Sequence, residues 1–331
     1  MAKTKTRYEC TTCGATYSSW TGKCNACNEW NTIQAQLDIA SVELKNTGKI
    51  IQTESIGTVI TESNNTEERI DTQDKQLNDV LGGGIVRGSV LLLAGQPGIG
   101  KSTLLMQLSH AISRRKSVLY ISGEESTRQV ASRAKRLGAT SETLQLASSM
   151  SADDIAHTIA EESFDVVIVD SIQTITVESI ASAAGNVSQI TNSTQLLTKA
   201  AKMSNTALVL VGHVTKEGSI AGPKLLEHSV DVVLQFEGDR YGGFKVVRSV
   251  KNRYGSTNEV AIYEMEQEGL KAIVNPSAAL LSERQIVDGS IVLATIEGTR
   301  PVLVEIQALV NPTSYGYPKR AASGFDLNRM N

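Results

Sequence analysis

The chain has 331 residues, of which 40% are hydrophobic and 4% aromatic, and its formal net charge is −3. That length accommodates two or three compact units with buried, mainly aliphatic cores. The charge balance excludes a general electrostatic attraction to nucleic acid or to acidic membranes, so DNA contact would need a local basic surface. No run approaches the roughly 20 apolar residues of a membrane-spanning helix, and the N-terminus lacks a secretory signal. We expect a cytoplasmic protein with no membrane partner.

The cysteines form two Cys-x-x-Cys pairs separated by ten residues: Cys10, Cys13, Cys24 and Cys27. Four thiolates satisfy a tetrahedral Zn²⁺, whereas a redox pair would need only one such motif. So short a segment has no core, so metal would supply most of its folding free energy. We predict a zinc-binding module over residues 1–33 whose closed site serves docking or DNA contact. Residues 34–69 are polar and predict a linker with at most one weak strand at Gly57–Ile60.

Short apolar runs alternate with amphipathic segments from residue 70 to about residue 271. This alternation predicts an α/β unit, a doubly wound parallel sheet. Three later strands follow one another without helices, and a turn at 241–243 predicts an antiparallel edge. The expected strands are 89–94, 118–121, 166–169, 207–211, 232–236, 244–250 and 259–265, and the expected helices are 102–113, 127–137, 152–162 and 189–203. Residues 272–331 contain two further strands, at 291–296 and 302–309, which are too few to enclose a core and predict an incomplete domain.

A phosphate-binding motif lies between the first of these strands and the first helix. Gly95-Gln96-Pro97-Gly98-Ile99-Gly100-Lys101-Ser102 fits G-x-x-x-x-G-K-[ST] in its required strand-to-helix context. Glycines let backbone N–H groups turn toward phosphates, and the helix N-terminus adds positive potential. Lys101 would reach the β- and γ-phosphates of ATP, and Ser102 would ligate Mg²⁺.

Carboxylates follow two other strands. Asp170 ends the apolar run 165–170, where an acid typically holds Mg²⁺ through water, although it could also cap the following turn. Glu124 and Glu125 follow the strand 118–121, where one of them could orient the attacking water. The same pair could instead cap the next helix, and the residues alone do not choose between these roles or between the two glutamates.

Taken together, these motifs resemble the RadA (Sms) family of bacterial DNA repair proteins in the RecA superfamily. The segments that carry the resemblance are the cysteine pairs with Trp20, Gly22 and Trp30-Asn31-Thr32, then Leu81-Gly82-Gly83-Gly84, Gly212-His213-Val214-Thr215-Lys216-Glu217-Gly218 and Lys251-Asn252-Arg253-Tyr254-Gly255. The last of these is similar to the family signature K-N-R-F-G, with Tyr in place of Phe. Residues 297–301, 307–309 and 324–329 resemble the start of the family's Lon-protease-like domain, which continues beyond this point in family members.

The resemblance implies a RecA-like core in a homo-hexameric ring that binds single-stranded or branched DNA, works with a RecA-type recombinase and drives branch migration with ATP. Lys101, Ser102 and Thr103 would bind nucleotide, Asp170 would support Mg²⁺, and Glu124 would position water. His213 would sense the γ-phosphate, and Lys251 and Arg253 would enter the neighbouring subunit's site. DNA contacts would come from the loops Glu178–Gln189 and Thr215–Lys224, with Lys216 and Lys224 as the better candidates.

Two other functions compete with a DNA-dependent, helicase-like ATPase. A slow RecA-type ATPase could act as a nucleotide-dependent scaffold or signalling protein. An ATP-dependent protease is a poorer interpretation, because the sequence ends before a Ser–Lys dyad can be placed. Stimulation of hydrolysis by DNA would separate the first two.

Overall fold

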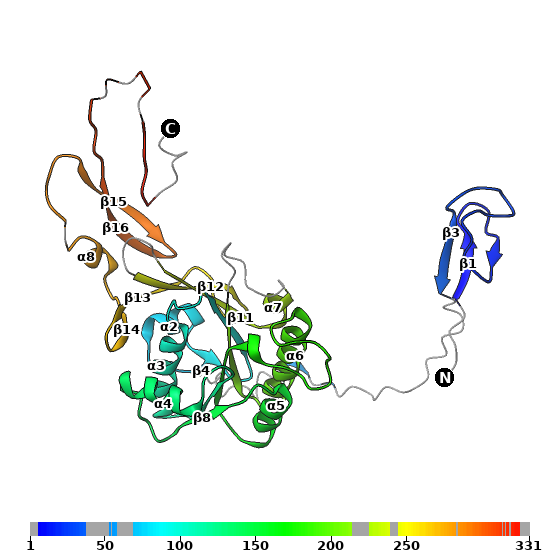
Figure 1. The fold of residues 1–331 in the computed structure, drawn as a ribbon, viewed down its shortest axis with the longest axis horizontal. Helices are drawn as coiled ribbons and strands as arrows, with labels where there is room; N and C mark the ends of the chain where they lie inside the picture. Colours follow the sequence, from blue (N-terminus) through cyan, green and yellow to red (C-terminus); the bar gives the residue numbers. More distant parts are fainter. Residues whose placement is uncertain are drawn as a thin grey trace. The chain divides into compact units, whose positions relative to one another are not determined.

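The structure is a computed structural model that describes residues 6–37, 53, 55–57, 69–213, 225–238 and 244–324, except positions 283, 313, 315 and 318. The chain forms two compact units, Met1–Asn64 and Asn65–Asn331. The first contains a small β-structure, and the second contains a large sheet with helices on both faces (Figure 1). Every helix in the described ranges is too short or too polar to cross a membrane.

The first unit contains a three-stranded antiparallel sheet. Strands β1 (Thr6–Cys10), β2 (Thr16–Tyr17) and β3 (Ile33–Leu37) lie in the order β2-β1-β3. Because β3 pairs with β1 along its whole length, regular structure extends past the predicted start of the linker at residue 34. The strand expected at 57–60 is not seen at Gly57, which is helical, and residues 58–60 lie outside the described part.

The second unit is built on a nine-stranded sheet in the order β14-β13-β12-β11-β6-β10-β9-β7-β8. The six strands from β11 to β8 are parallel, and β12, β13 and β14 add the predicted antiparallel edge. The strands are β6 (Val90–Gly95), β7 (Val118–Ser122), β8 (Leu144–Ser148), β9 (Val166–Asp170), β10 (Ala207–His213), β11 (Val232–Gly238), β12 (Phe244–Asn252), β13 (Val260–Glu266) and β14 (Gly269–Ala272). A separate two-stranded sheet pairs β4 (Arg69–Ile70) with β5 (Ile85–Val86).

Helices cover both faces of this sheet, as a parallel sheet with buried strands requires (Figure 1). One apolar cluster joins α2, α3 and α4 to one face, and a second joins α5, α6 and α7 to the other. Side-chain caps fix several helix starts, among them the capping box that Ser126 and Gln129 form at α4. The helices are α2 (Lys75–Leu81), α3 (Lys101–Ser113), α4 (Thr127–Arg136), α5 (Ala152–Glu161), the 3₁₀ turn η2 (Ile172–Thr174), α6 (Val187–Met203), α7 (Leu225–Ser229) and α8 (Pro276–Leu280).

All the strands and helices expected between residues 89 and 265 are present, with ends shifted by a few residues. Sequence reasoning missed β8 and β14, which lie at the two edges of the sheet. An edge strand is short and partly exposed, so its residues do not form the continuous apolar run that marked the central strands. The turn expected at 241–243 lies outside the described residues, although β11 and β12 do pair antiparallel.

Two strands expected near the C-terminus form an antiparallel hairpin, β15 (Ser290–Glu297) with β16 (Arg300–Gln307). The hairpin is hydrogen-bonded to the sheet-bearing part of the same unit: the Arg300 guanidinium donates to the side-chain oxygen of Gln76 on α2, at 2.9 Å. Gln76 also accepts from the Ile262 N–H of β13 and donates to the Ile273 carbonyl, so one buried amide joins three segments.

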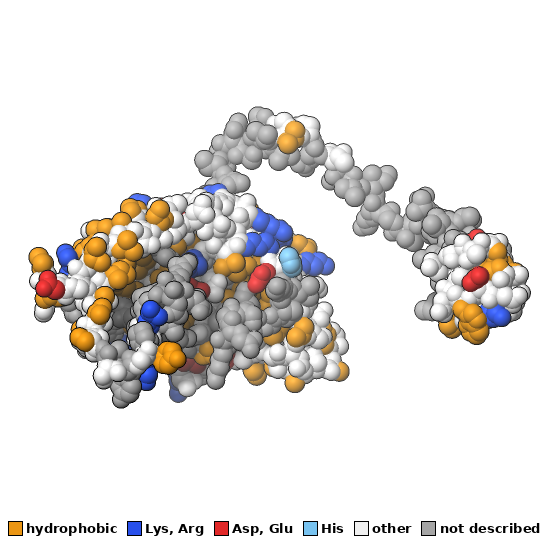
Figure 2. Space-filling view, turned by 90° about the horizontal axis from the view of Figure 1, so that it is seen from above, with side chains coloured by type: hydrophobic (Ala, Val, Ile, Leu, Met, Phe, Trp, Pro, Cys, Tyr) orange, Lys and Arg blue, Asp and Glu red, His pale blue; other side chains and the backbone are white. Residues whose placement is uncertain are grey.

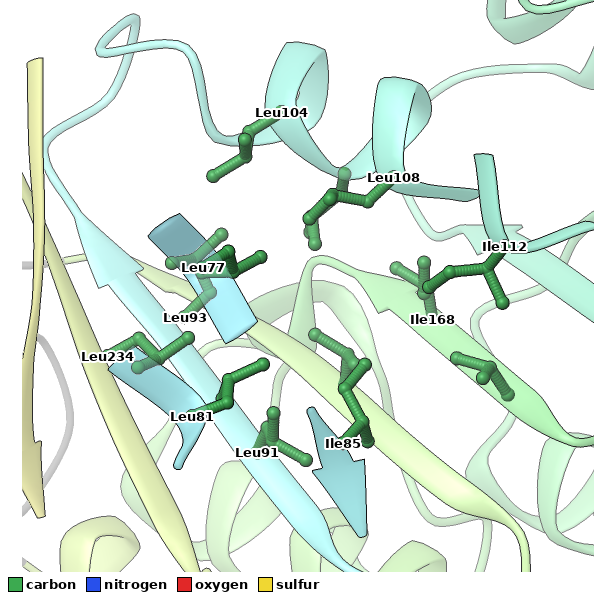
Figure 3. A pocket seen from close by; sticks show the side chains of 13 residues that line it. Leu77, Leu81, Ile85, Leu91, Leu93, Leu104, Leu108, Ile112, Ile168 and Leu234 are labelled. Carbon is green, nitrogen blue, oxygen red and sulfur yellow. The ribbon is translucent and has the colours of Figure 1, made fainter. Parts of the chain in front are cut away.

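The α3 face of the sheet encloses a small apolar cavity of about 30 Å³. Figure 3 shows aliphatic side chains from β6, α2 and α3 pointing into it. Its lining is entirely hydrocarbon, so it offers water no hydrogen-bond partner and we expect it to be dry. The lining residues are Leu77, Leu81, Ile85, Leu91, Leu93, Leu104, Leu105, Leu108, Ile112, Val166, Ile168, Val209 and Leu234.

Leu93→Ala should lower the free energy of unfolding of the second unit by about 2–5 kcal/mol, because it enlarges a cavity beneath the central strand. Urea denaturation should show a lower midpoint with an unchanged slope. The control is Met203→Ala at the end of α6, where the side chain is 78% exposed; its change should stay within about 0.5 kcal/mol. Equal losses in the two variants would contradict the assigned packing.

Candidate nucleotide and zinc sites

The predicted phosphate loop connects β6 to α3. β6 lies between β10 and β11 and is buried along its whole length. Gly98 and Gly100 have φ values of 75° and 116°, a region that favours glycine, and Gly100 is the N-cap of α3. The loop therefore has the backbone freedom to aim several N–H groups at a phosphate, next to the N-terminus of a 13-residue helix.

Lys101 is the first residue of α3, and its side chain folds back over the loop. Its ammonium donates to the carbonyls of Gly95 and Gln96 at 2.9 and 3.0 Å. It also lies 3.1 Å from Nδ1 of His213. Burial lowers the pKa of Lys101, and the nearby carboxylates of Asp170 and Glu124 oppose that shift.

The register of the parallel strands brings the predicted site residues to one edge of the sheet. His213, the last residue of β10, is level with Gly95 at the end of β6. Asp170, the last residue of β9, is level with Ser122 at the end of β7, and Glu124 follows two residues later. The carboxyl ends of four strands thus meet in one place, where ligands of open parallel sheets bind.

Asp170 is held by a buried phenol that sequence reasoning missed. The Tyr120 hydroxyl donates to Asp170 Oδ2 at 2.5 Å from the neighbouring strand β7. Burial, together with the charge of Asp170, raises the pKa of Tyr120 well above its usual value, so the phenol remains a proton donor. A tyrosine within the otherwise aliphatic run Val118–Ile121 was the available signal. Asp170 Oδ1 and the Ser102 hydroxyl are hard oxygen donors of the kind that Mg²⁺ prefers.

The two glutamates after β7 have different surroundings. The Ser171 hydroxyl donates to Glu124 Oε1 at 2.7 Å, and this same oxygen lies 3.9 Å from His213 Nε2. Glu125 instead forms an ion pair with Arg133 of α4, with 2.6 Å between Oε2 and Nη1. Glu124 therefore lies among the strand-end residues, while Glu125 is engaged with a helix.

The hydrogen bonding of His213 defines its tautomer. A lysine ammonium only donates, so Nδ1 of His213 accepts from Lys101 and Nε2 carries the ring proton toward Glu124. Burial, followed by the adjacent Lys101 charge, lowers the pKa of His213, which keeps the imidazole neutral at physiological pH. Lys101, His213, Glu124 and Ser171 thus form one chain of polar contacts.

The structure does not bring Lys251 and Arg253 to this edge. Asn252, between them, is level with Val232 of β11, which is level with Leu91 of β6. Leu91 precedes Gly95 by four residues, which is about 13 Å along a strand. Both basic residues therefore lie toward the opposite end of the sheet from the phosphate loop of the same chain.

Contacts within the chain hold both of these side chains. The Lys251 ammonium donates to the carbonyls of Glu227 and Val230 at 2.6 and 2.7 Å, and burial lowers its pKa. The Arg253 guanidinium pairs with Asp231 at 2.9 Å but is itself 55% exposed. Asp231 is buried and also accepts from the Val90 N–H at the start of β6.

The K-N-R-Y-G and L-G-G-G motifs pack against each other. Asn252 donates to the Val80 carbonyl at 3.3 Å. A Cβ at Gly82 would lie 3.0 Å from the Cα of Gly255 and 3.1 Å from the Tyr254 carbonyl. Two motifs about 170 residues apart in the chain therefore form one contact, which only glycine at residue 82 allows.

The predicted DNA loops are only partly described. Residues 178–186 form an irregular segment before α6, and the side-chain amide of Gln189 binds the carbonyls of Ile180 and Ser182 there, both at 2.9 Å. Residues 214–224, with the candidates Lys216 and Lys224, lie outside the described part.

The four cysteines of the first unit converge on one point. Their sulfur atoms all lie within 4.8 Å of one another, with 3.7 Å between Cys10 and Cys27 and 3.6 Å between Cys13 and Cys24. A tetrahedral zinc with Zn–S bonds near 2.3 Å requires S···S separations of about 3.8 Å, so these thiols fit such an ion. The Tyr17 hydroxyl lies 3.0 Å from Cys24 Sγ, and a hydrogen bond from it lowers the pKa of that thiol.

Two family models match sequence ranges that contain these sites. Residues 61–219 match a family described as an AAA domain, and residues 8–35 match one described as a rubredoxin metal binding domain. DNA repair protein RadA of Bacillus subtilis is 48% identical over 335 residues, which cover all of this chain and 73% of that protein. The chain belongs to the RadA family.

Other RadA proteins show the same extent of match. The Aquifex aeolicus DNA repair protein RadA is 45% identical over 331 residues, again all of this chain and 73% of its relative. A solved structure of the RadB recombinase is 20% identical and aligns with a TM-score of 0.47 over 62% of this chain and 99% of its own. RadA membership places the chain among DNA repair ATPases, with a RecA-like α/β core and a zinc ribbon.

The purified chain should carry one zinc per molecule, and Cys24→Ser should lose it. Metal binding is worth about 10–16 kcal/mol in comparable peptides, and its loss removes most of the module's stability. Elemental analysis gives the metal and its stoichiometry, and the control Thr12→Ala changes an exposed residue between Cys10 and Cys13. Full zinc occupancy in Cys24→Ser, or iron in the native chain, would contradict this assignment.

Proposed function

We propose that this RadA-family chain binds ATP with Mg²⁺ at the carboxyl edge of its sheet and couples hydrolysis to movement on single-stranded or branched DNA. The observation that carries the proposal is the convergence of Lys101, Asp170, Glu124 and His213 at the ends of four adjacent parallel strands. Family membership supports ATP hydrolysis in DNA repair. Branch migration, with a RecA-type recombinase as partner, is the finer activity that we infer from the family resemblance.

The nucleotide site uses the loop Gly95–Gly100 with Lys101, Ser102 and Thr103. Backbone N–H groups of the loop would bind the phosphates, and the Lys101 ammonium would move from the loop carbonyls to the β- and γ-phosphate oxygens. Ser102 and, through water, Asp170 would hold the Mg²⁺, which neutralises charge on those oxygens when it is bound. Tyr120 fixes one Asp170 oxygen and so leaves the other to face the ion.

Glu124 would orient the attacking water and accept its proton. Its carboxylate is half exposed, so it is open to a water molecule, and the Ser171 hydroxyl holds one of its oxygens. His213 lies between Glu124 and Lys101, so it would register whether Lys101 has moved to a γ-phosphate. The change would reach the segment that follows β10, where the second DNA loop begins.

Lys251 and Arg253 would act on the ATP of a neighbouring subunit in a homo-hexameric ring. They lie too far along the sheet to serve the phosphate loop of their own chain. The exposed Arg253 guanidinium is the better placed of the two, while Lys251 would first have to leave the carbonyls of Glu227 and Val230. An arginine supplied across a subunit boundary accelerates hydrolysis by about 10³–10⁵ in other systems.

Glu124→Gln should lower the rate of hydrolysis by about 10²–10⁴-fold and leave nucleotide affinity unchanged, because it removes a general base and keeps the hydrogen-bonding shape. Glu125→Gln is the matched control and should stay within a few-fold of the native rate. Single-turnover hydrolysis and binding of a fluorescent ATP analogue separate the two quantities. The opposite ranking of the variants would reassign the base to Glu125.

The function itself is tested by ATP hydrolysis with and without single-stranded DNA. We expect stimulation by DNA that disappears in Lys101→Ala, while Lys199→Ala, at an exposed lysine of α6, retains it. A branched DNA substrate then measures strand exchange at the junction. Hydrolysis that is indifferent to DNA would instead support the second candidate, a nucleotide-dependent scaffold.

A further inference from the structure

Both tryptophans of the chain lie on the surface of the zinc module. Trp20 is 59% exposed and Trp30 is 69% exposed, and among residues 8–34, whose side chains the structure describes, no other large hydrophobic side chain is exposed. The small core of the module consists of Cys10, Cys24 and Ile33, with Tyr8 and Tyr17 among the side chains packed against it. The two indoles are therefore not part of the packing that holds the module together.

The two rings flank one glycine. A Cβ at Gly22 would lie 3.8 Å from Trp20 Cη2 and 3.9 Å from Trp30 Cζ3, so both rings lie next to the backbone of Gly22. The Trp20 indole N–H donates to the Ile33 carbonyl at 3.2 Å, which fixes its ring. Gly22 accepts from the Asn31 N–H at 2.9 Å, which holds the two tryptophan-bearing segments together.

A positive charge accompanies these rings. The Lys23 ammonium lies 5.7 Å from the centroid of the Trp30 ring, within cation–π range. Figure 2 shows exposed hydrophobic side chains beside a basic side chain on this module. Trp20, Gly22, Lys23 and Trp30 together form a tryptophan platform.

The size of the platform indicates its partner. Two indoles with well over half of their surface exposed offer roughly 300 Å² of apolar area, given the 150–250 Å² that an aromatic side chain can bury. A stable protein–protein interface needs about 800 Å² on each partner, and the residues next to the two tryptophans in the sequence, Ser19, Thr21, Glu29 and Asn31, are polar. One or two nucleobases match the available area, stack on flat rings regardless of base identity, and bring a phosphate that Lys23 can pair with.

We propose that the tryptophan platform binds unpaired bases of single-stranded DNA by stacking, with Lys23 on the adjacent phosphate. The inference deepens the proposed function and rests on it, because it assigns a DNA contact to the zinc module in addition to the loops of the ATPase core. Zinc then has an indirect role in DNA binding: it fixes the fold that presents the rings.

The experiment uses intrinsic tryptophan fluorescence of the full chain. Trp20 and Trp30 are its only tryptophans, so any change in their emission reports on the platform. Oligothymidylate should quench the emission, and an abasic oligomer of equal length, which retains the phosphates, should not. Trp30→Ala should weaken oligothymidylate binding, measured by the anisotropy of a labelled strand, by about 5- to 150-fold, since stacking is worth about 1–3 kcal/mol per base.

Two variants keep this result interpretable. Trp30→Phe retains a ring and should recover most of the affinity, whereas Tyr317→Ala removes an exposed aromatic side chain of the second unit and should bind normally. Zinc content is measured in each variant, so that an unfolded module is recognised.

The outcomes separate the two proposals. Oligothymidylate that binds and stimulates hydrolysis without quenching would overturn the platform and leave the proposed function standing. Equal quenching of the tryptophan emission by the abasic oligomer would overturn the stacking proposal. Emission that is unchanged by DNA but is quenched when a partner protein is added would overturn it as well. A chain that neither binds DNA nor responds to it in hydrolysis would remove the proposed function as well.

Discussion

Alignment of the parallel strands β6, β10, β9 and β7 is the constraint on which the nucleotide chemistry depends. Each strand is mainly aliphatic and buried, and the four end in different residues: Gly95, His213, Asp170 and Ser122, with Glu124 two residues after Ser122. Backbone hydrogen bonds fix the register, and the register places these ends together. A shift of one residue would turn every inward side chain to the other face of the sheet, so packing and chemistry are secured by the same interactions.

The opposite end of the sheet has a different organising group, the buried carboxylate of Asp231. It accepts a hydrogen bond from the start of β6 and pairs with Arg253 and Lys202. A buried carboxylate that loses its partners costs several kcal/mol. Arg253 therefore has a structural role within its own chain, and any action on a neighbouring subunit would have to leave Asp231 satisfied, for which Lys202 is available.

The zinc module is stabilised by metal binding and not by a large hydrophobic core. Its core of a few side chains is far too small to offset the entropy of ordering the chain, and metal binding to four thiolates supplies the difference. Because the metal holds the fold, the module can leave both indoles exposed instead of burying them. Exposed aromatic rings on a rigid base are the usual basis of stacking surfaces.

The sequence by itself predicted the four cysteine ligands, the phosphate loop and most strands and helices of the large sheet, because each depends on residue types at fixed local spacing. The edge strands β8 and β14 carry no such signal. The residues alone left Glu124 and Glu125 undistinguished, and the family resemblance favoured Glu124. The tertiary structure added that these neighbours differ in what lies across from them: Ser171 for one and Arg133 for the other. The tertiary structure alone showed the hydrogen bond from Tyr120 to Asp170. It also placed Lys251 and Arg253 away from the phosphate loop of their own chain. These facts depend on which strands become neighbours and in what register, and pairing between distant segments leaves no periodic signal in the sequence.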